Sequence, residues 1–507
     1  MKHHAVRLLS LALALLTACG TAPAAPEDDA VQQDPAVLND STGQQDPELT
    51  APPEQSMEER QAEFLAFLEE VNAQRRAIYE APDPPQLDES WTSELTDMDH
   101  DFTQDEMDHI LTRRDPVSVT VQEAREDVET AFRLLRNCYG AYDYFGGDEV
   151  FLPLRDAALA ALPEEGEVTS ETLEKALADT LSPVLVDGHF LIGSTAMRDT
   201  HARYMYYVPD LYLDFDDAAG IDPELVKPTI GEDGGLCLTL ATLATPEEVR
   251  ALPDELTLHG NTVSLSWNKD AEIRSKTKDT FSESTMAGDV PLLISTAMSA
   301  STNKQQKQLD RLASCGGEYA DAPVLVLDVR NNGGGADTYI NQWFEGYTGQ
   351  YPDRRVAGGW KFSAFNRYIY VNHPRLAYPE EFLSEPSHWI ISSTPGQFVE
   401  RDGLTIVLQN KGTASSGETA VQNVRSLDNA LLVGGCTMGC AMVLNVINFY
   451  LPHSGVTLRF GTGLLFCEDM TNRDGKGWLP NLWVPSFVSE QRVEAMIEYY
   501  DLTELFA

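Results

Sequence analysis

The chain has few basic residues. Its 36 lysines and arginines face 80 aspartates and glutamates, which gives a formal net charge of −44 over 507 residues. A nucleic-acid partner is therefore not expected, because phosphate binding needs a basic face. Electrostatic adhesion to anionic lipid is not expected either. The simplest explanation of the acidity is the solubility of an exported protein.

The sequence also lacks the spacings of a metal site. No Cys-x-x-Cys pair or histidine cluster has zinc-ligand spacing, so we expect no metal. Six cysteines follow Cys19, and exported proteins can keep disulfides. Their pairing cannot be read from the sequence, although Cys436 and Cys440 are close enough along the chain to pair locally.

The first apolar run, residues 8–16, is too short for a membrane span, which needs about 20 residues. Lys2 and Arg7 precede it, as is typical of a secretory signal. The run ends in Leu16-Thr-Ala-Cys-Gly20, which resembles a bacterial lipobox. The resemblance implies a signal peptide over 1–19 and a diacylated Cys19 that anchors the protein outside the bacterial cell membrane. An ordinary signal sequence that happens to contain a cysteine is the alternative.

Composition and periodicity divide the rest of the chain into four parts. Residues 20–57 are rich in Ala, Pro, Asp, Gln and Glu and are expected to form a disordered tether. Apolar residues at helical spacing predict a helical domain over 58–199, which begins with a charged helix at 58 to about 80. Alternating patterns predict a β-rich segment over 200–284, including a strand at 211–215. Strands that alternate with helices predict an α/β domain with a mostly parallel sheet over 285–507.

Two strand-and-turn units of the α/β part could build an active site. The apolar run at 324–329 is expected to form a buried strand that delivers the glycines 333–335. Glycines at a strand end let backbone N–H groups approach a ligand, so Gly333 or Gly334 could hold a developing oxyanion. An ordinary glycine-rich turn is the alternative.

The second unit delivers Ser415 and Ser416 to the start of a helix, after the apolar strand 404–408. A serine there can be exposed near the positive end of the helix dipole. The alternative is a helix cap, because Ser415 and Glu418 also fit the capping-box pattern. A serine nucleophile needs a base, usually histidine, and His189 follows Asp-Gly after another apolar run.

The order of five motifs resembles the C-terminal-processing (tail-specific) and tricorn-core serine peptidase family. They are Val326-Leu-Asp-Val-Arg-Asn-Asn-Gly-Gly-Gly335, Gly412-Thr-Ala-Ser-Ser-Gly-Glu418, Val433-Gly-Gly-Cys-Thr-Met-Gly439, Leu451-Pro-His-Ser-Gly-Val456 and Asp474-Gly-Lys-Gly-Trp-Leu-Pro480. The resemblance implies an α/β fold with a crotonase-like (ClpP-like) catalytic core. It also implies that Ser415, three residues before a glutamate, is the nucleophile.

Two departures from the motifs favour the histidine-dependent branch of that family. Cys440 stands where members with a Ser–Lys dyad carry the lysine, and no PDZ-like segment is recognisable. The Asp-Gly-His motif that ends at His189 matches the base of the tricorn-like branch. Asp474 occupies the position of the acid that orients the histidine, although Asn481 replaces a further aspartate of the motif.

The resemblance implies hydrolysis of extracytoplasmic peptides or proteins by acyl transfer, without a cofactor. His189 would accept the Ser415 proton, Asp474 would orient the imidazole, and N–H groups of Ser416 and of Gly333 or Gly334 would hold the oxyanion. An inactive surface lipoprotein that captures peptides is the alternative, because a fold alone does not guarantee activity. A lipoprotein that binds small sugars would have no use for both Ser415 and His189.

Overall fold

The computed structural model describes residues 55–95, 98–271, 278–372 and 380–507. The predicted signal sequence, Cys19 and most of the predicted tether lie outside these ranges. Among the helices that the structure describes, none is long and apolar enough to cross a membrane.

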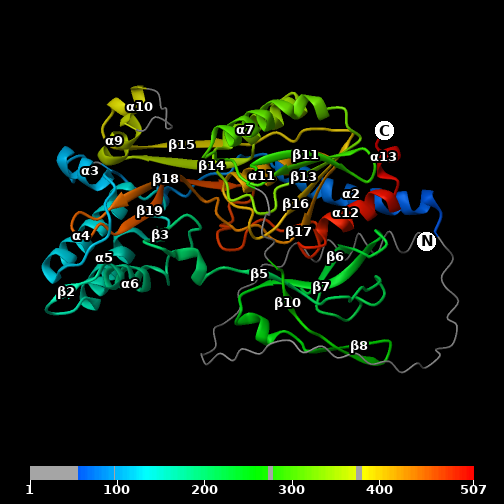
Figure 1. Ribbon diagram of the computed structural model, residues 1–507, viewed down its shortest axis with the longest axis horizontal. Helices are drawn as coiled ribbons and strands as arrows, with labels where there is room; N and C mark the ends of the chain where they lie inside the picture. Colours follow the sequence, from blue (N-terminus) through cyan, green and yellow to red (C-terminus); the bar gives the residue numbers. More distant parts are fainter. Residues whose placement is uncertain (1–54, 96–97, 272–277, 373–379) are drawn as a thin grey trace.

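The centre of the molecule is a six-stranded sheet in the order β11-β12-β13-β16-β17-β20 (Figure 1). Strand β11 is antiparallel to β12, and the other neighbours are parallel. The strands are β11 (Phe281–Met286), β12 (Val290–Ser295), β13 (Val324–Asp328), β16 (Leu404–Gln409), β17 (Ala430–Gly434) and β20 (Leu482–Trp483). The predicted buried strands at 324–329 and 404–408 are therefore confirmed.

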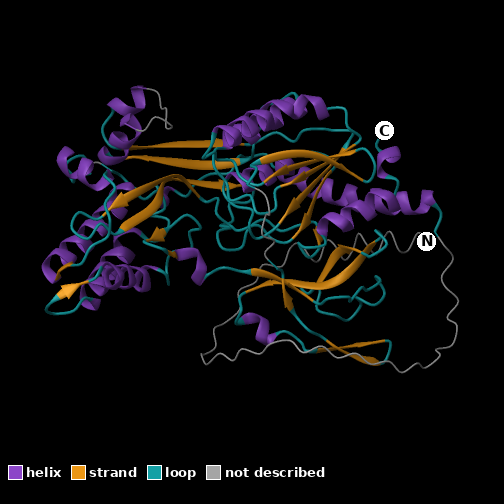
Figure 2. Ribbon diagram, viewed as in Figure 1, coloured by secondary structure: helices purple, strands orange, loops and turns teal. Residues whose placement is uncertain are grey.

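Alternate side chains of the central strands face two separate apolar cores, because successive side chains of a strand point to opposite faces. Val326 and Ile406 pack on the side of α2 (Met57–Tyr79) and α12 (Ser489–Tyr499). Leu327 and Val407 pack on the side of three other helices, which are α7 (Asn303–Cys315), α8 (Asp337–Thr348) and α11 (Ser416–Arg425). Helices thus cover both faces of the sheet (Figure 2). This is the arrangement that buries a parallel sheet.

Helix α2 confirms the predicted helix near 58–80 but packs on the central sheet. It begins at a capping box formed by Ser56 and Glu59. Its apolar residues, among them Phe64 and Leu68, are buried in the same core as the central strands. The region predicted as one helical domain, 58–199, is therefore divided between two bodies of the molecule.

The other N-terminal helices pack against a second sheet, of order β15-β14-β19-β3-β4, with β18 paired to β19. These helices are α3 (Gln104–Leu111), α4 (Val121–Cys138), α5 (Gly147–Ala161) and α6 (Ser170–Leu181). The strands are β3 (Leu191–Ile192), β4 (Thr195–Ala196), β14 (Val356–Phe362), β15 (His388–Thr394), β18 (Val443–Tyr450) and β19 (Thr457–Cys467). Helices α9 (Ala364–Asn372) and α10 (Glu380–Ser384) join β14 to β15.

The predicted β-rich segment is a small sheet of order β10-β5-β7-β6 with a separate β8–β9 hairpin. Its strands are β5 (Tyr204–Tyr207), β6 (Val226–Ile230), β7 (Leu236–Ala244), β8 (Glu255–Leu258), β9 (Asn261–Ser264) and β10 (Asn268–Lys269). The strand expected at 211–215 is wrong, because only Leu213 forms an isolated bridge. Asp214 instead accepts the backbone N–H groups of Asp216 and Asp217, which turns the chain away.

The predicted fold class, an α/β core with an N-terminal helical region and a β-rich insertion, is confirmed. All six cysteines of the described ranges are free thiols. The local disulfide considered for Cys436 and Cys440 is therefore not formed.

Candidate active site

Ser415 lies in a strained turn between β16 and α11. Its φ of 52° and ψ of −121° are rarely adopted by residues other than glycine. The turn is fixed by Asn410, whose Oδ1 accepts the N–H groups of Gly412 at 3.0 Å and of Asn331 at 2.9 Å. Strained backbone of this kind persists where the surroundings enforce it and gathers at functional sites.

The glycine loop after β13 lies directly against Ser415. Gly334 has a φ of +96°, and a Cβ built there would lie 2.6 Å from Ser415 Cβ. No side chain fits between the loop and the serine. Asn332 supports the loop from behind, since its Nδ2 donates to Ser295 Oγ at 2.9 Å.

The N–H of Gly334 was one of the two glycine N–H groups predicted to hold the oxyanion, but it is not free to do so. That N–H is donated to Asn332 Oδ1 at 3.0 Å. The N–H groups of Gly333 and Ser416 make no hydrogen bond to any residue that the structure describes. Gly333 and Ser416 are therefore the donors left for a developing negative charge beside Ser415.

The structure brings His189 to Ser415 from a segment 226 residues away, with Nε2 3.2 Å from the serine Oγ. His189 follows α6 and precedes β3, and it is 8% exposed. Asp187 fixes the turn that carries it. One Asp187 oxygen accepts the His189 backbone N–H at 2.7 Å, and the other accepts the Tyr139 hydroxyl at 2.8 Å.

The second ring nitrogen of His189 has no orienting group. Nδ1 is buried and has no hydrogen-bond partner among the described residues. Burial, together with the positive charges of Arg459 and Arg198, lowers the pKa of His189 to about 4. The imidazole is therefore neutral near pH 7 and able to accept a proton at Nε2.

Asp474 does not hold the His189 ring, in contrast to the role predicted for it. Its Oδ2 accepts the N–H of Gly188 at 2.9 Å, and its Oδ1 accepts those of Ala441 at 3.0 Å and Met442 at 3.1 Å. The carboxylate therefore ties the backbone beside His189 to residues 441–442. Sequence position alone could not separate a bond to the ring from a bond to the neighbouring backbone.

Glu418 is a second buried carboxylate at the site, and the sequence had suggested only a capping role for it. It accepts the N–H groups of Ser415 at 3.3 Å, Gly439 at 3.0 Å and Cys440 at 2.7 Å. Burial raises its pKa to about 7. Glu418 thus connects the serine turn to the same segment, 437–442, that Asp474 connects to the histidine turn.

Neither Lys411 nor Cys440 can act as the base. Lys411 Nζ donates to the backbone oxygens of Thr437, Met438 and Gly475, at 3.2, 3.0 and 2.9 Å. Cys440 is buried, and burial raises the pKa of its thiol well above the usual range. No motif in the sequence indicated that Lys411 joins the loops around the site.

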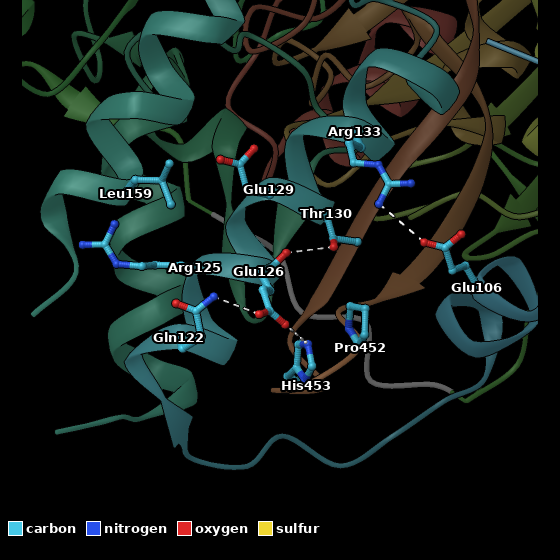
Figure 3. Close-up of a pocket in the computed structure, with 10 residues that line it drawn as sticks. All are labelled: Glu106, Gln122, Arg125, Glu126, Glu129, Thr130, Arg133, Leu159, Pro452 and His453. Carbon is cyan, nitrogen blue, oxygen red and sulfur yellow. Dashed lines mark hydrogen bonds and ion pairs between the residues drawn. The ribbon is translucent and has the colours of Figure 1, made fainter. Parts of the chain in front are cut away.

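A cavity of about 590 Å³ lies elsewhere, between α3, α4, α5 and the turn after β18 (Figure 3). None of the predicted site residues lines it. Its charged groups are partly paired with one another, as in the 3.0 Å contact of His453 with Glu126. We assign the site by its chemistry, since the residues able to react lie at Ser415.

No group of His, Cys, Asp and Glu suited to a metal occurs in the described parts of the chain.

Three solved structures have a similar chain trace at low sequence identity. Mature CPAF is 12% identical, with a TM-score of 0.43, over 76% of this chain and 98% of that one. The photosystem II D1 C-terminal processing protease is 15% identical, with a TM-score of 0.35, over 72% and 94%. The tricorn protease is 15% identical, with a TM-score of 0.34, over 76% and 37%. Such distant likenesses carry no information on residue roles.

A search of curated protein sequences finds no match to this chain. The model of peptidase family S41 matches residues 292–484, which include the glycine loop, Ser415, Glu418 and Asp474. His189 lies before the matched region. Residues 292–484 therefore form a region similar to peptidase family S41.

Proposed function

We propose that this protein is a serine endopeptidase or processing peptidase whose nucleophile is Ser415 and whose base is His189. The observation that carries the proposal is the 3.2 Å approach of His189 Nε2 to Ser415 Oγ. If Ser415 were only a helix cap, its hydroxyl would not need the buried His189 from a distant segment as a neighbour.

The reaction follows from this geometry. Ser415 Oγ attacks the peptide carbonyl carbon while its proton passes to His189 Nε2. The N–H groups of Gly333 and Ser416 stabilise the negative oxygen of the tetrahedral intermediate. The imidazolium then gives its proton to the leaving amine as the C–N bond breaks. Water, deprotonated by His189, hydrolyses the acyl-enzyme and regenerates Ser415.

Asp474 contributes to this reaction as a positioning residue. It fixes the backbone of Gly188, and this holds the imidazole of His189 against Ser415 without a bond to Nδ1. Its function here is the placement of the ring, since no contact to the ring stabilises the charge that forms on it.

The unpartnered Nδ1 favours a second candidate function, an inactive peptide-binding protein. A fluorophosphonate probe separates the two. Covalent labelling of the wild type, lost in Ser415→Ala and in His189→Ala, supports the peptidase. A wild type that is not labelled, and that hydrolyses no peptide in a mixed library, supports the binder.

We also propose that Cys19 is diacylated and that the protein acts outside the cell, anchored to the bacterial membrane. The lipobox resemblance and the acidic composition support this location. Cys19→Ala should release the protein or leave it unprocessed while the S41-like region stays folded. A wild-type protein that incorporates no radiolabelled fatty acid would rule the anchor out.

A further inference from the structure

Two arginines lie beside the proposed base, in a chain that has few basic residues. Arg198, in the turn Met197–Thr200, donates from Nη1 to Gly188 O at 3.0 Å. Arg459 of β19 is the register partner of Leu191 of β3, two residues after His189. Both positive charges act on the His189 ring, because each lowers its pKa.

Arg459 is unusual because it is exposed and unpaired. Its side chain forms no hydrogen bond or ion pair with any residue in the described ranges, although the chain has 80 acidic residues. Within the described ranges, Arg198 forms one ion pair, with Asp199 at 3.6 Å, and the side chain of Asp199 is 69% exposed. Of the two guanidinium groups beside the base, that of Arg459 thus has no acidic partner in the described ranges, and that of Arg198 has only a solvent-exposed one.

Such an arrangement is unfavourable for the free enzyme. A positive charge near His189 opposes formation of the imidazolium on which the proposed reaction depends. A negative group of the substrate placed between the arginines would remove that penalty when the substrate binds. Guanidinium groups suit a carboxylate for this purpose, because their planar N–H fork can bind both of its oxygens.

We propose that Arg198 and Arg459 form a subsite for a carboxylate of the substrate peptide, next to the scissile bond. This inference rests on the proposed function, because the subsite lies next to the scissile bond only if Ser415 is the nucleophile. The carboxylate belongs either to an acidic side chain or to a free C-terminus. Overall charge cannot produce such a preference, because a net charge of −44 repels acidic peptides and attracts basic ones.

The test measures peptide binding to Ser415→Ala by fluorescence anisotropy, so that it does not depend on hydrolysis. The two peptides of the first pair have either Glu or Gln near the centre, and both are amidated at the C-terminus. A second pair is uncharged and differs by a free against an amidated C-terminus. We expect one of the two carboxylates to tighten binding by about tenfold, as for one charge-assisted contact at a partly exposed site. The pair that shows the effect identifies the source.

Arg459→Ala, added to Ser415→Ala, should abolish this difference. Arg113→Ala, which removes an exposed arginine from the loop after α3, serves as the charge-matched control and should keep it. Arg459→Glu should reverse the preference toward a peptide with Lys at the same position. A loss of folding alone would not produce such a reversal.

Two results would overturn the subsite: equal binding of both members of both pairs, or a carboxylate preference that survives Arg459→Ala and Arg459→Glu. Failure of the peptidase proposal looks different. In that case the wild type is not labelled by fluorophosphonate, while the carboxylate preference of the Ser415→Ala protein is still present.

Discussion

The carboxylate of Asp474 accepts the backbone N–H of Gly188 at 2.9 Å and thereby holds the residue before His189 instead of the imidazole. The same carboxylate accepts the N–H groups of Ala441 and Met442. Glu418 holds the preceding residues, Gly439 and Cys440, and also the N–H of Ser415. One short segment, 437–442, therefore sets the histidine turn and the serine turn relative to each other.

Asp474→Asn should reduce activity by moving His189, without changing the titration of its ring. An amide offers one acceptor oxygen, so its NH2 group must face backbone N–H donors that the carboxylate now accepts. We expect kcat to fall by up to about a hundredfold, as for a small misplacement of a catalytic group. The free energy of unfolding should fall by about 1–3 kcal/mol.

The pH dependence of kcat/KM in Asp474→Asn distinguishes this role from direct orientation of the ring. We expect the acidic limb to stay where it is in the wild type. An acidic limb that moves in this variant would show that Asp474 acts on the imidazole in the working enzyme.

Ser415→Ala and His189→Ala should each lower turnover by several orders of magnitude, and the double variant should be little worse. The reason is that a nucleophile and its base act as one unit. If Ser415 were only a helix cap, Ser415→Ala would cost about 1 kcal/mol of stability and leave turnover unchanged. Peptide hydrolysis and melting temperature measured on the same proteins decide between these outcomes.

Gly334→Ala should abolish fluorophosphonate labelling. The new Cβ would lie 2.6 Å from Ser415 Cβ and 3.0 Å from Ala414 O, at a φ of +96° that disfavours alanine. Gly333→Ala is the matched control, because no heavy atom lies within 4 Å of a Cβ built there. Gly333→Ala keeps its backbone N–H and should retain most of the labelling. Equal loss in both variants would contradict the close approach of Gly334 to the nucleophile.

The acidic limb of kcat/KM should lie near the pKa of His189, about 4, instead of the usual 6.5. The base must be neutral to accept the Ser415 proton. A lowered pKa therefore keeps the enzyme active as the pH falls through 6, and activity is lost only as the pH approaches 4.

Arg459→Ala removes a positive charge that disfavours the imidazolium, so it should shift this limb to higher pH. Arg113→Ala should leave the limb unchanged. A wild-type limb near 6.5 would show that the ring is more solvated than the structure indicates.

Local patterns were enough to predict much of the fold. The apolar runs at 324–329 and 404–408 and the charged helix near 58–80 depend mainly on neighbouring residues, and the structure confirms all three. The strand expected at 211–215 failed because Asp214 bonds the backbone just after it and forms a turn. The placement of α2 on the catalytic sheet was not predictable, since an amphipathic helix does not show which apolar surface it will cover.

Local patterns of the chain establish which residue types are available for chemistry: a serine at a helix start, glycines at a strand end, and a histidine in an Asp-Gly-His turn. Each of these follows from residues adjacent in the chain. How they meet depends on the packing of the whole molecule. It placed His189 at 3.2 Å from Ser415, directed Asp474 to Gly188, committed the Gly334 N–H to Asn332, and set Arg459 beside Leu191. Such contacts join segments up to 286 residues apart. They depend on how whole sheets and helices pack, which no local pattern encodes.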